Sequence, residues 1–255
     1  MMSSKPVNKL NTDRLQSESF VKQAYESYKT FISDGSLPAI TIEVLSEADG
    51  TDLARHNFVD GKHIVSVHKD LHHIQKVATP YLYHEFTHLL DHETNFVGTD
   101  VNTRAAYLFL FTEFHASQIM MMSFLGFESI NDMKHISLSN EISDLTQKLS
   151  LSDFLTYKKA EYLNDLGKLK MYGNMKNFLK GCAVFMYYLG WLSVCTKFSK
   201  DDFREHSNVD GFYPILGDTM YKIIEKLNRL EPITNDKLID LASCQLLLGR
   251  KFGVL

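Results

Sequence analysis

The residues of this chain whose types and spacing could do chemistry are His84, Glu85 and His88, in a His-Glu-x-x-His pattern. In a helix, residues four apart lie about 40° from each other around the axis, so both histidines share one face. Two imidazoles in this arrangement can hold one Zn²⁺ ion. Glu85 points about 100° away from His84, which suits a base for a metal-bound water and not a ligand. The motif therefore predicts a hydrolytic zinc site with one Zn²⁺ per chain.

A hydrolytic zinc site takes three protein ligands and keeps one position open for water. Glu113 is the third ligand we favour, because it lies within an apolar stretch where a carboxylate needs a cation as its partner. A pairing with Arg104 or a lysine, or exposure to water, is the alternative for this carboxylate. Asp91 is a rival ligand, since it shares the histidine face three residues after His88 and can ligate the metal or orient a histidine.

Peptide hydrolysis also needs a donor that stabilises the developing oxyanion, commonly a tyrosine or histidine. Three residues near the motif are candidates for this role and remain open alternatives: Tyr83, His92 and His115. His92 and His115 are also weaker candidates for the third ligand. The histidines before the motif have no partner at ligand spacing within a helix, so we expect surface or sheet-edge positions for them. They are His56, His63, His68, His72 and His73.

The motif must lie on an amphipathic helix with one side fixed to a core, because apolar residues occupy the face opposite the histidines. These residues are Leu82, Phe86, Leu89 and Leu90. Thr79 can cap this helix and Pro80 suits its first position, where a missing N–H costs nothing. A second, largely buried helix is expected over residues 101–125, ended by Gly126, and it carries Glu113.

The segment before the motif predicts a helix over residues 12–33 and a strand over 39–45. Two β-rich runs, 55–59 and 62–68, are joined by Asp60-Gly61, which is a strong hairpin signal. We therefore expect a small antiparallel sheet packed on the motif helix.

No strand pattern is evident after residue 128, and helices are expected over 139–149, 152–166, 172–196, 213–230 and 235–248. The fourth carries an apolar stripe expected to be core, formed by Met220, Ile223, Ile224, Leu227 and Leu230. The predicted fold class is α+β, with a domain over 1–130 and a helical region of unknown role over 131–255. That region either stands apart or packs with the first as one unit.

Composition and charge are those of an ordinary soluble globular protein, with 44% hydrophobic and 23% charged residues. The formal net charge of −4 argues against a general nucleic-acid-binding surface. Cys182, Cys195 and Cys244 are odd in number and lack ligand spacing, so reduced thiols of a cytoplasmic protein are expected. The N-terminus has no apolar signal core, and no export is expected.

The most apolar segment, 181–196, has 16 residues, whereas a bilayer span needs about 20. We therefore expect a buried central helix and no membrane contact. A membrane-anchored protein is the alternative.

A short sheet, then His84-Glu85-x-x-His88, then Glu113-x-x-Ala116 on the following helix resembles the gluzincin metallopeptidases. It looks most like the family named after the immunity-repressor protease ImmA and the radiation-response regulator IrrE. The resemblance covers roughly residues 35–127 and implies a zincin-like fold. It also implies a cytoplasmic zinc endopeptidase that cleaves a protein substrate, in several members a DNA-bound repressor, often encoded by phages or other mobile elements.

Three positions depart from zinc-peptidase patterns. The extended three-histidine signature is not met, because Asp91 and Thr94 stand where a glycine and the third histidine would lie. Many gluzincins place an aspartate four residues after the third ligand, whereas this chain has Ser117 there. No helix-turn-helix pattern stands out, so a repressor would be a separate partner.

A protein that keeps a zincin-like metal site for regulation or binding, without proteolysis, is the alternative function. The intact Glu85 favours catalysis, because a structural site does not need it.

Overall fold

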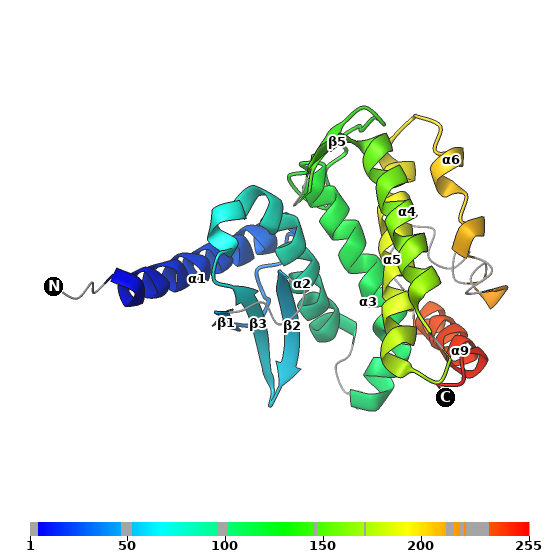
Figure 1. Cartoon of the computed structure of the whole chain (residues 1–255), viewed down its shortest axis with the longest axis horizontal. Coiled ribbons are helices and arrows are strands. Elements are labelled where there is room, and N and C mark those ends of the chain that lie inside the picture. Colours follow the sequence, from blue (N-terminus) through cyan, green and yellow to red (C-terminus); the bar gives the residue numbers. More distant parts are fainter. Residues whose placement is uncertain are drawn as a thin grey trace.

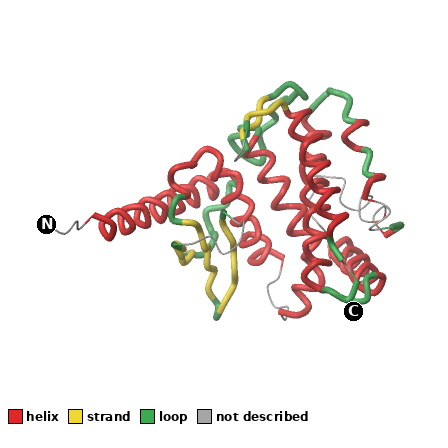
Figure 2. The backbone as a smooth tube through the Cα atoms, viewed as in Figure 1, coloured by secondary structure: helices red, strands yellow, loops and turns green. Residues whose placement is uncertain are grey.

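The computed structural model describes residues 5–46, 53–95, 101–144, 147–170, 172–212, 217–219, 222 and 235–254. Figure 1 shows a long N-terminal helix and a small sheet on one side of the molecule and a group of upright helices on the other. Figure 2 shows that helices dominate and that strands are confined to two small regions. The chain is thus a mixed α+β protein with a mostly helical C-terminal half, as its sequence predicts.

The N-terminal helix α1 spans Lys5–Phe31, and it therefore begins earlier than the helix expected over 12–33. Its buried aromatic side chains pack on the motif helix, with the rings of Tyr25 and Phe86 at 4.9 Å and those of Tyr28 and Tyr83 at 5.2 Å. This aromatic contact fixes the back of the motif helix to α1.

Three strands form the sheet: β1 (Ile40–Leu45), β2 (Ala54–Val59) and β3 (Lys62–His68). The predicted β2–β3 hairpin is confirmed, and both turn residues have positive φ, 50° at Asp60 and 74° at Gly61. These angles are those that an Asp-Gly turn favours.

The expectation of a purely antiparallel sheet is wrong. The strand order is β1-β3-β2, and β1 pairs with β3 in parallel. The hairpin occupies one edge of β3, and β1 joins β3 at its opposite edge. Whether β1 runs parallel or antiparallel to β3 depends on the path of the connection between β1 and the hairpin, and turn residues do not indicate this path. β2 is left as an edge strand, lying against the motif helix.

The motif helix α2 spans Gln75–Asn95 and continues directly from the short 3₁₀ helix η1 (Leu71–Ile74). The expected start at Thr79 and Pro80 is wrong. The Thr79 hydroxyl donates to the Gln75 carbonyl over 2.8 Å, so it lies inside the helix and caps nothing. Pro80 therefore removes one backbone hydrogen bond, and the buried apolar face of α2 outweighs this cost.

Helix α3 (Val101–Phe124) carries Glu113 and packs between α2 and α5 (Met175–Phe198). Of the described helices, α5 alone is long and apolar enough to cross a membrane, but 78% of its apolar window is buried inside the fold. The expected buried central helix is thus confirmed. Cys182 and Cys195, which lie on α5, are buried with it.

The C-terminal half also contains α4 (Leu151–Lys168), α6 (Arg204–Ser207), η2 (Asp210–Phe212) and α9 (Asn235–Lys251). The helix expected over 139–149 is wrong, because this segment forms a hairpin of β4 (Glu141–Ser143) and β5 (Lys148–Ser150).

Turn chemistry explains this hairpin. The Asp144 side chain accepts a hydrogen bond from the Gln147 backbone amide at 3.0 Å. Within β4, Ile142 is buried and its two neighbours are exposed, which is the alternation of a strand. Most of the helix expected over 213–230, including the stripe at Met220, Ile223, Ile224, Leu227 and Leu230, lies outside the described residues.

Candidate metal centre

His84 and His88 project from the same face of α2, one turn apart. Their Nε2 atoms lie 3.1 Å from each other, and the two rings meet edge to face with centroids 4.6 Å apart. Leu82, Phe86 and Leu89 are fully buried on the opposite face. The core contact therefore fixes the rotation of α2 so that both imidazoles point away from α1.

Glu113 on α3 faces both imidazoles. Its Oε2 atom lies 3.5 Å from His84 Nε2 and 3.8 Å from His88 Nε2. Ligand atoms in a tetrahedral zinc shell are about 3.3 Å apart, given bonds of roughly 2.0–2.1 Å. The three atoms are thus close to the separation that one zinc ion requires, and their side chains are only 7–17% exposed.

The donor set also passes an independent test for a cation. Glu113 Oε2 is buried and has no hydrogen-bond partner, which is unusual for a carboxylate oxygen. Burial raises the pKa of Glu113, but the His88 and His84 imidazoles outweigh burial and the net direction is down. The residues present therefore fit a divalent metal, because a buried anionic oxygen faces two imidazole nitrogens.

Thr112 contacts the His88 ring at the nitrogen that faces away from His84 and Glu113. Its hydroxyl lies 2.8 Å from His88 Nδ1. A partner on Nδ1 fixes the ring orientation and leaves Nε2 to bind metal. The Arg104 side chain, the alternative partner of Glu113, lies outside the part of the chain that the structure describes.

Glu85 lies beside the two histidines and is held by the sheet. The backbone amide of His56, on edge strand β2, donates to Glu85 Oε2 over 2.7 Å. Burial raises the pKa of Glu85, and the His88 and His84 imidazoles oppose this shift only in part. The carboxylate is thus oriented next to the candidate metal position and is a better proton acceptor than a solvent-exposed glutamate.

Tyr187 on α5 completes the site from the C-terminal half. Its ring packs edge to face on His84 with centroids 5.1 Å apart, and burial, together with the neighbouring carboxylates of Glu113 and Glu85, raises the pKa of its hydroxyl. The approach of α5 that brings it there depends on Gly190. A Cβ atom at that position would lie 2.6 Å from the Phe114 carbonyl oxygen and 2.7 Å from Ser117 Cβ.

The other residues singled out in the sequence lie elsewhere or do other work. Asp91 is buried and its Oδ1 lies 2.8 Å from His115 Nδ1, so these two pair with each other. Tyr83 packs against Tyr28 and Phe31 in the core. His92 Nδ1 lies 3.0 Å from Glu93 near the end of α2, and Ser117 donates to the Glu113 carbonyl over 2.7 Å.

Two side chains of the site, Thr112 and Tyr187, escape sequence reasoning. Thr112 is next to Glu113 in the sequence. A hydroxyl residue adjacent to a candidate ligand is a weak signal for such a supporting role. Tyr187 lies about 70 residues after Glu113 in the sequence, in an apolar segment whose pattern indicates only a buried helix. The small residues Ser117 and Gly190, which allow α3 and α5 to approach closely, are the signal that points to it.

The expectation that all histidines before the motif are surface or sheet-edge residues is wrong for two of them. The His63 and His72 side chains are 4% and 7% exposed. Both belong to clusters with carboxylates contributed by helices, which no local spacing reveals.

Comparison with known proteins returns no match, whether with family models, with curated proteins or with solved structures. The function of the site must therefore be argued from its own geometry.

Proposed function

We propose that this chain is a zinc-dependent endopeptidase that uses His84, His88 and Glu113 as ligands of one Zn²⁺. The observation that carries the proposal is the buried, unpartnered Glu113 Oε2 facing two imidazole Nε2 atoms. A zinc ion bound there would act as a Lewis acid and bring the pKa of a coordinated water to about 7.

The chain's own residues supply the acid–base chemistry. Glu85, aligned by the His56 amide, takes the proton of the attacking water and returns it to the leaving amine. The Tyr187 hydroxyl belongs to a ring that packs on His84, lies near the Glu113 carboxylate, and would donate a hydrogen bond to the developing oxyanion. It takes the role for which Tyr83, His92 and His115 were the sequence candidates.

A protein substrate is supported by the position of β2. This strand is one of the two edges of the sheet, and the main-chain amide of its residue His56 donates to Glu85. An extended peptide can add to such an edge as a further strand, which would bring its carbonyl groups past Glu85. The proposal includes a cytoplasmic location and a repressor-like protein as substrate, with no direct nucleic-acid or membrane contact.

Replacing Glu85 by Gln tests this function. Wild type and Glu85→Gln are compared for zinc content and for cleavage of a proteome-derived peptide library read by mass spectrometry. The amide cannot accept the proton, so cleavage should fall at least about 100-fold while zinc stays bound. Glu128→Gln, at an exposed glutamate, is the matched control and should cleave normally. A wild-type chain that holds no zinc, or a Glu85→Gln variant that still cleaves, overturns the proposal.

A zincin-like site that regulates without proteolysis is favoured by one observation. Tyr187 already contacts Glu113, and a tyrosine oxygen that ligates the metal would close the shell with a fourth protein group. A crystal with anomalous scattering at the zinc edge separates the two functions, because the enzyme leaves a position for water and the closed site does not.

A further inference from the structure

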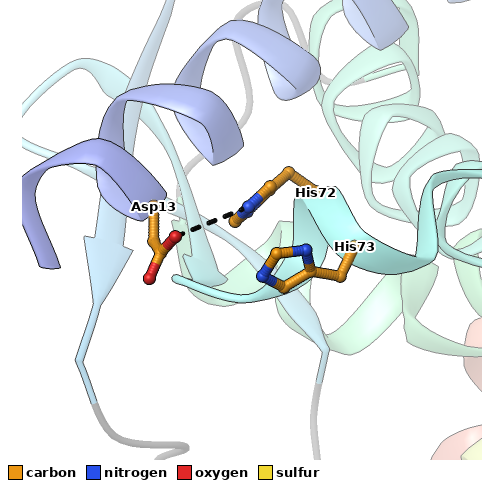
Figure 3. Close-up of side chains that lie close together, drawn as sticks. All are labelled: Asp13, His72 and His73. Carbon is orange, nitrogen blue, oxygen red and sulfur yellow. Dashed lines mark ion pairs between the residues drawn. The ribbon is translucent and has the colours of Figure 1, made fainter. Parts of the chain in front are cut away.

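A second group of metal-ligand side chains lies outside the site described above. Asp13 on α1 faces His72 and His73 on η1, and their ligand atoms all lie within 4.8 Å of one another. Figure 3 shows the His72 ring directed at the Asp13 carboxylate, with the His73 ring beside it. The two histidine rings have centroids 3.8 Å apart.

The hydrogen bonds of His72 determine which of its nitrogens carries a proton. Its Nδ1 lies 3.1 Å from the Lys69 carbonyl oxygen and 3.0 Å from Ser17 Oγ. Because a carbonyl only accepts, Nδ1 must donate. The Ser17 hydroxyl itself donates to the same Lys69 carbonyl, so its oxygen is also free to accept from Nδ1. The remaining nitrogen, Nε2, is the one that points toward Asp13.

This Nε2 atom has the surroundings of a ligand. It is buried without a hydrogen-bond partner, and the side chain is only 7% exposed. Asp13 Oδ1 lies 3.8 Å away, too far for a hydrogen bond. That separation is close to the roughly 3.3 Å between two ligands of one tetrahedral zinc ion.

We propose that Asp13, His72 and His73 bind a second divalent transition-metal ion, of which Zn²⁺ is the best fit. Two imidazoles and one carboxylate form the donor set that zinc commonly takes. His73 is exposed, so the remaining coordination position opens to water. The ion would tie α1 to η1, which leads directly into the helix of the first site.

The other histidine cluster near the sheet does not have these properties. His63 Nε2 lies 2.9 Å from Glu93 Oε1, and His63 Nδ1 lies 2.9 Å from His56 Nε2. Both nitrogens of the buried ring therefore have partners, and His92 shares the same Glu93 oxygen at 3.0 Å. This network is satisfied by hydrogen bonds and needs no cation, in contrast to His72.

Zinc stoichiometry of the full chain tests the proposal. Purified protein is loaded with ZnCl₂, freed of excess metal by gel filtration, and analysed by mass spectrometry of the metal. We expect two zinc ions in wild type, one in His72→Ala, one in His84→Ala/His88→Ala, and none in the combined variant. His135→Ala, at an exposed histidine away from every cluster, is the control and should keep two.

Because His72 is buried, its substitution can also disturb folding, so His73→Ala provides a second test at an exposed position. Loss of this imidazole should weaken zinc binding at this site at least about tenfold without changing the circular dichroism spectrum. Two bound ions in His72→Ala, or unchanged zinc affinity in His73→Ala, overturns the second site. A wild-type chain with one ion that is lost from His72→Ala but kept in His84→Ala/His88→Ala supports the second site and contradicts the proposed hydrolase.

Discussion

The two clusters, around His88 and around His72, use the same local arrangement in different surroundings. In each, a histidine has Nδ1 near a hydroxyl of a neighbouring helix, Thr112 at 2.8 Å or Ser17 at 3.0 Å. In each, Nε2 lies 3.8 Å from a carboxylate oxygen of that same helix. The pair His88 and Glu113 therefore has nearly the same geometry as the pair His72 and Asp13.

They differ in what surrounds the ligands. The first site has a second buried histidine one helical turn away, the carboxylate of Glu85 beside it and the ring of Tyr187 packed on His84. The second has the exposed His73, and its one carboxylate, Asp13, is itself a ligand. In our proposals, the base and the oxyanion donor, and not the ligand set, are what would make the first site hydrolytic and leave the second as an anchor.

The largest expected effect comes from removing the carboxylate charge in each cluster separately. Glu113→Gln should weaken zinc binding at the first site at least about 100-fold, because a neutral amide replaces the anionic ligand in a buried position. Asp13→Asn should do the same to the second ion only. Titration with zinc in competition with a chelating dye measures both, and a variant that loses both ions would show that the sites are not independent.

Tyr187→Phe tests the feature that the second cluster lacks. Removing one oxyanion donor lowers the rate of hydrolysis about 100-fold in comparable sites, and zinc should stay bound because Tyr187 is not a ligand in the proposed enzyme. Tyr162→Phe is the matched control, because Tyr162 is a neighbouring tyrosine on α4 that has no role in the proposed mechanism. Its ring centroid lies 6.4 Å from that of Tyr187. Equal rates in wild type and Tyr187→Phe would remove the tyrosine from the mechanism. Loss of zinc would instead favour the closed, regulatory site.

Gly190→Ala tests whether the close approach of α5 to α3 is what brings Tyr187 to the first site. The added methyl group would meet the Phe114 carbonyl oxygen at 2.6 Å, so α5 must move away from α3. We expect a loss of about 1–3 kcal/mol in the free energy of unfolding, together with weaker hydrolysis as Tyr187 shifts. Gly167→Ala on α4, where a Cβ has nothing within 4 Å, should be neutral or slightly stabilising. Urea unfolding measures the free energy of unfolding of both variants. If Gly190→Ala is as stable as wild type, α5 does not need a glycine there to approach α3.

Local features were predictable from the sequence. The Asp60-Gly61 turn fixed the β2–β3 hairpin, because both positions favour positive φ. The apolar residues of α2 identified its buried face, and the Gly126 stop agrees with its φ of 70° just beyond α3. The position of Glu113 within an apolar helix indicated a buried carboxylate, and the structure brings it to the two histidines.

Features that depend on contacts between distant segments were not predictable. The parallel pairing of β1 with β3 and the arrival of Tyr187 at His84 follow from how whole elements pack. The hairpin at β4 and β5 was missed because its strands have three residues each, too few for an alternating pattern to stand out from a helical one. His72 was missed for a similar reason, since its carboxylate partner comes from α1.

The smallest effect should come from the hydroxyls that support the two histidines. Thr112→Val keeps the shape of the side chain but leaves His88 Nδ1 without the oxygen at 2.8 Å, and zinc affinity at the first site should fall about tenfold. Ser17→Ala should weaken the second site less, because His72 Nδ1 keeps the Lys69 carbonyl at 3.1 Å. The same dye titration measures both variants. If Ser17→Ala costs as much affinity as Thr112→Val, the carbonyl does not hold the His72 ring, and the assignment of Nε2 as the ligand atom there loses its basis.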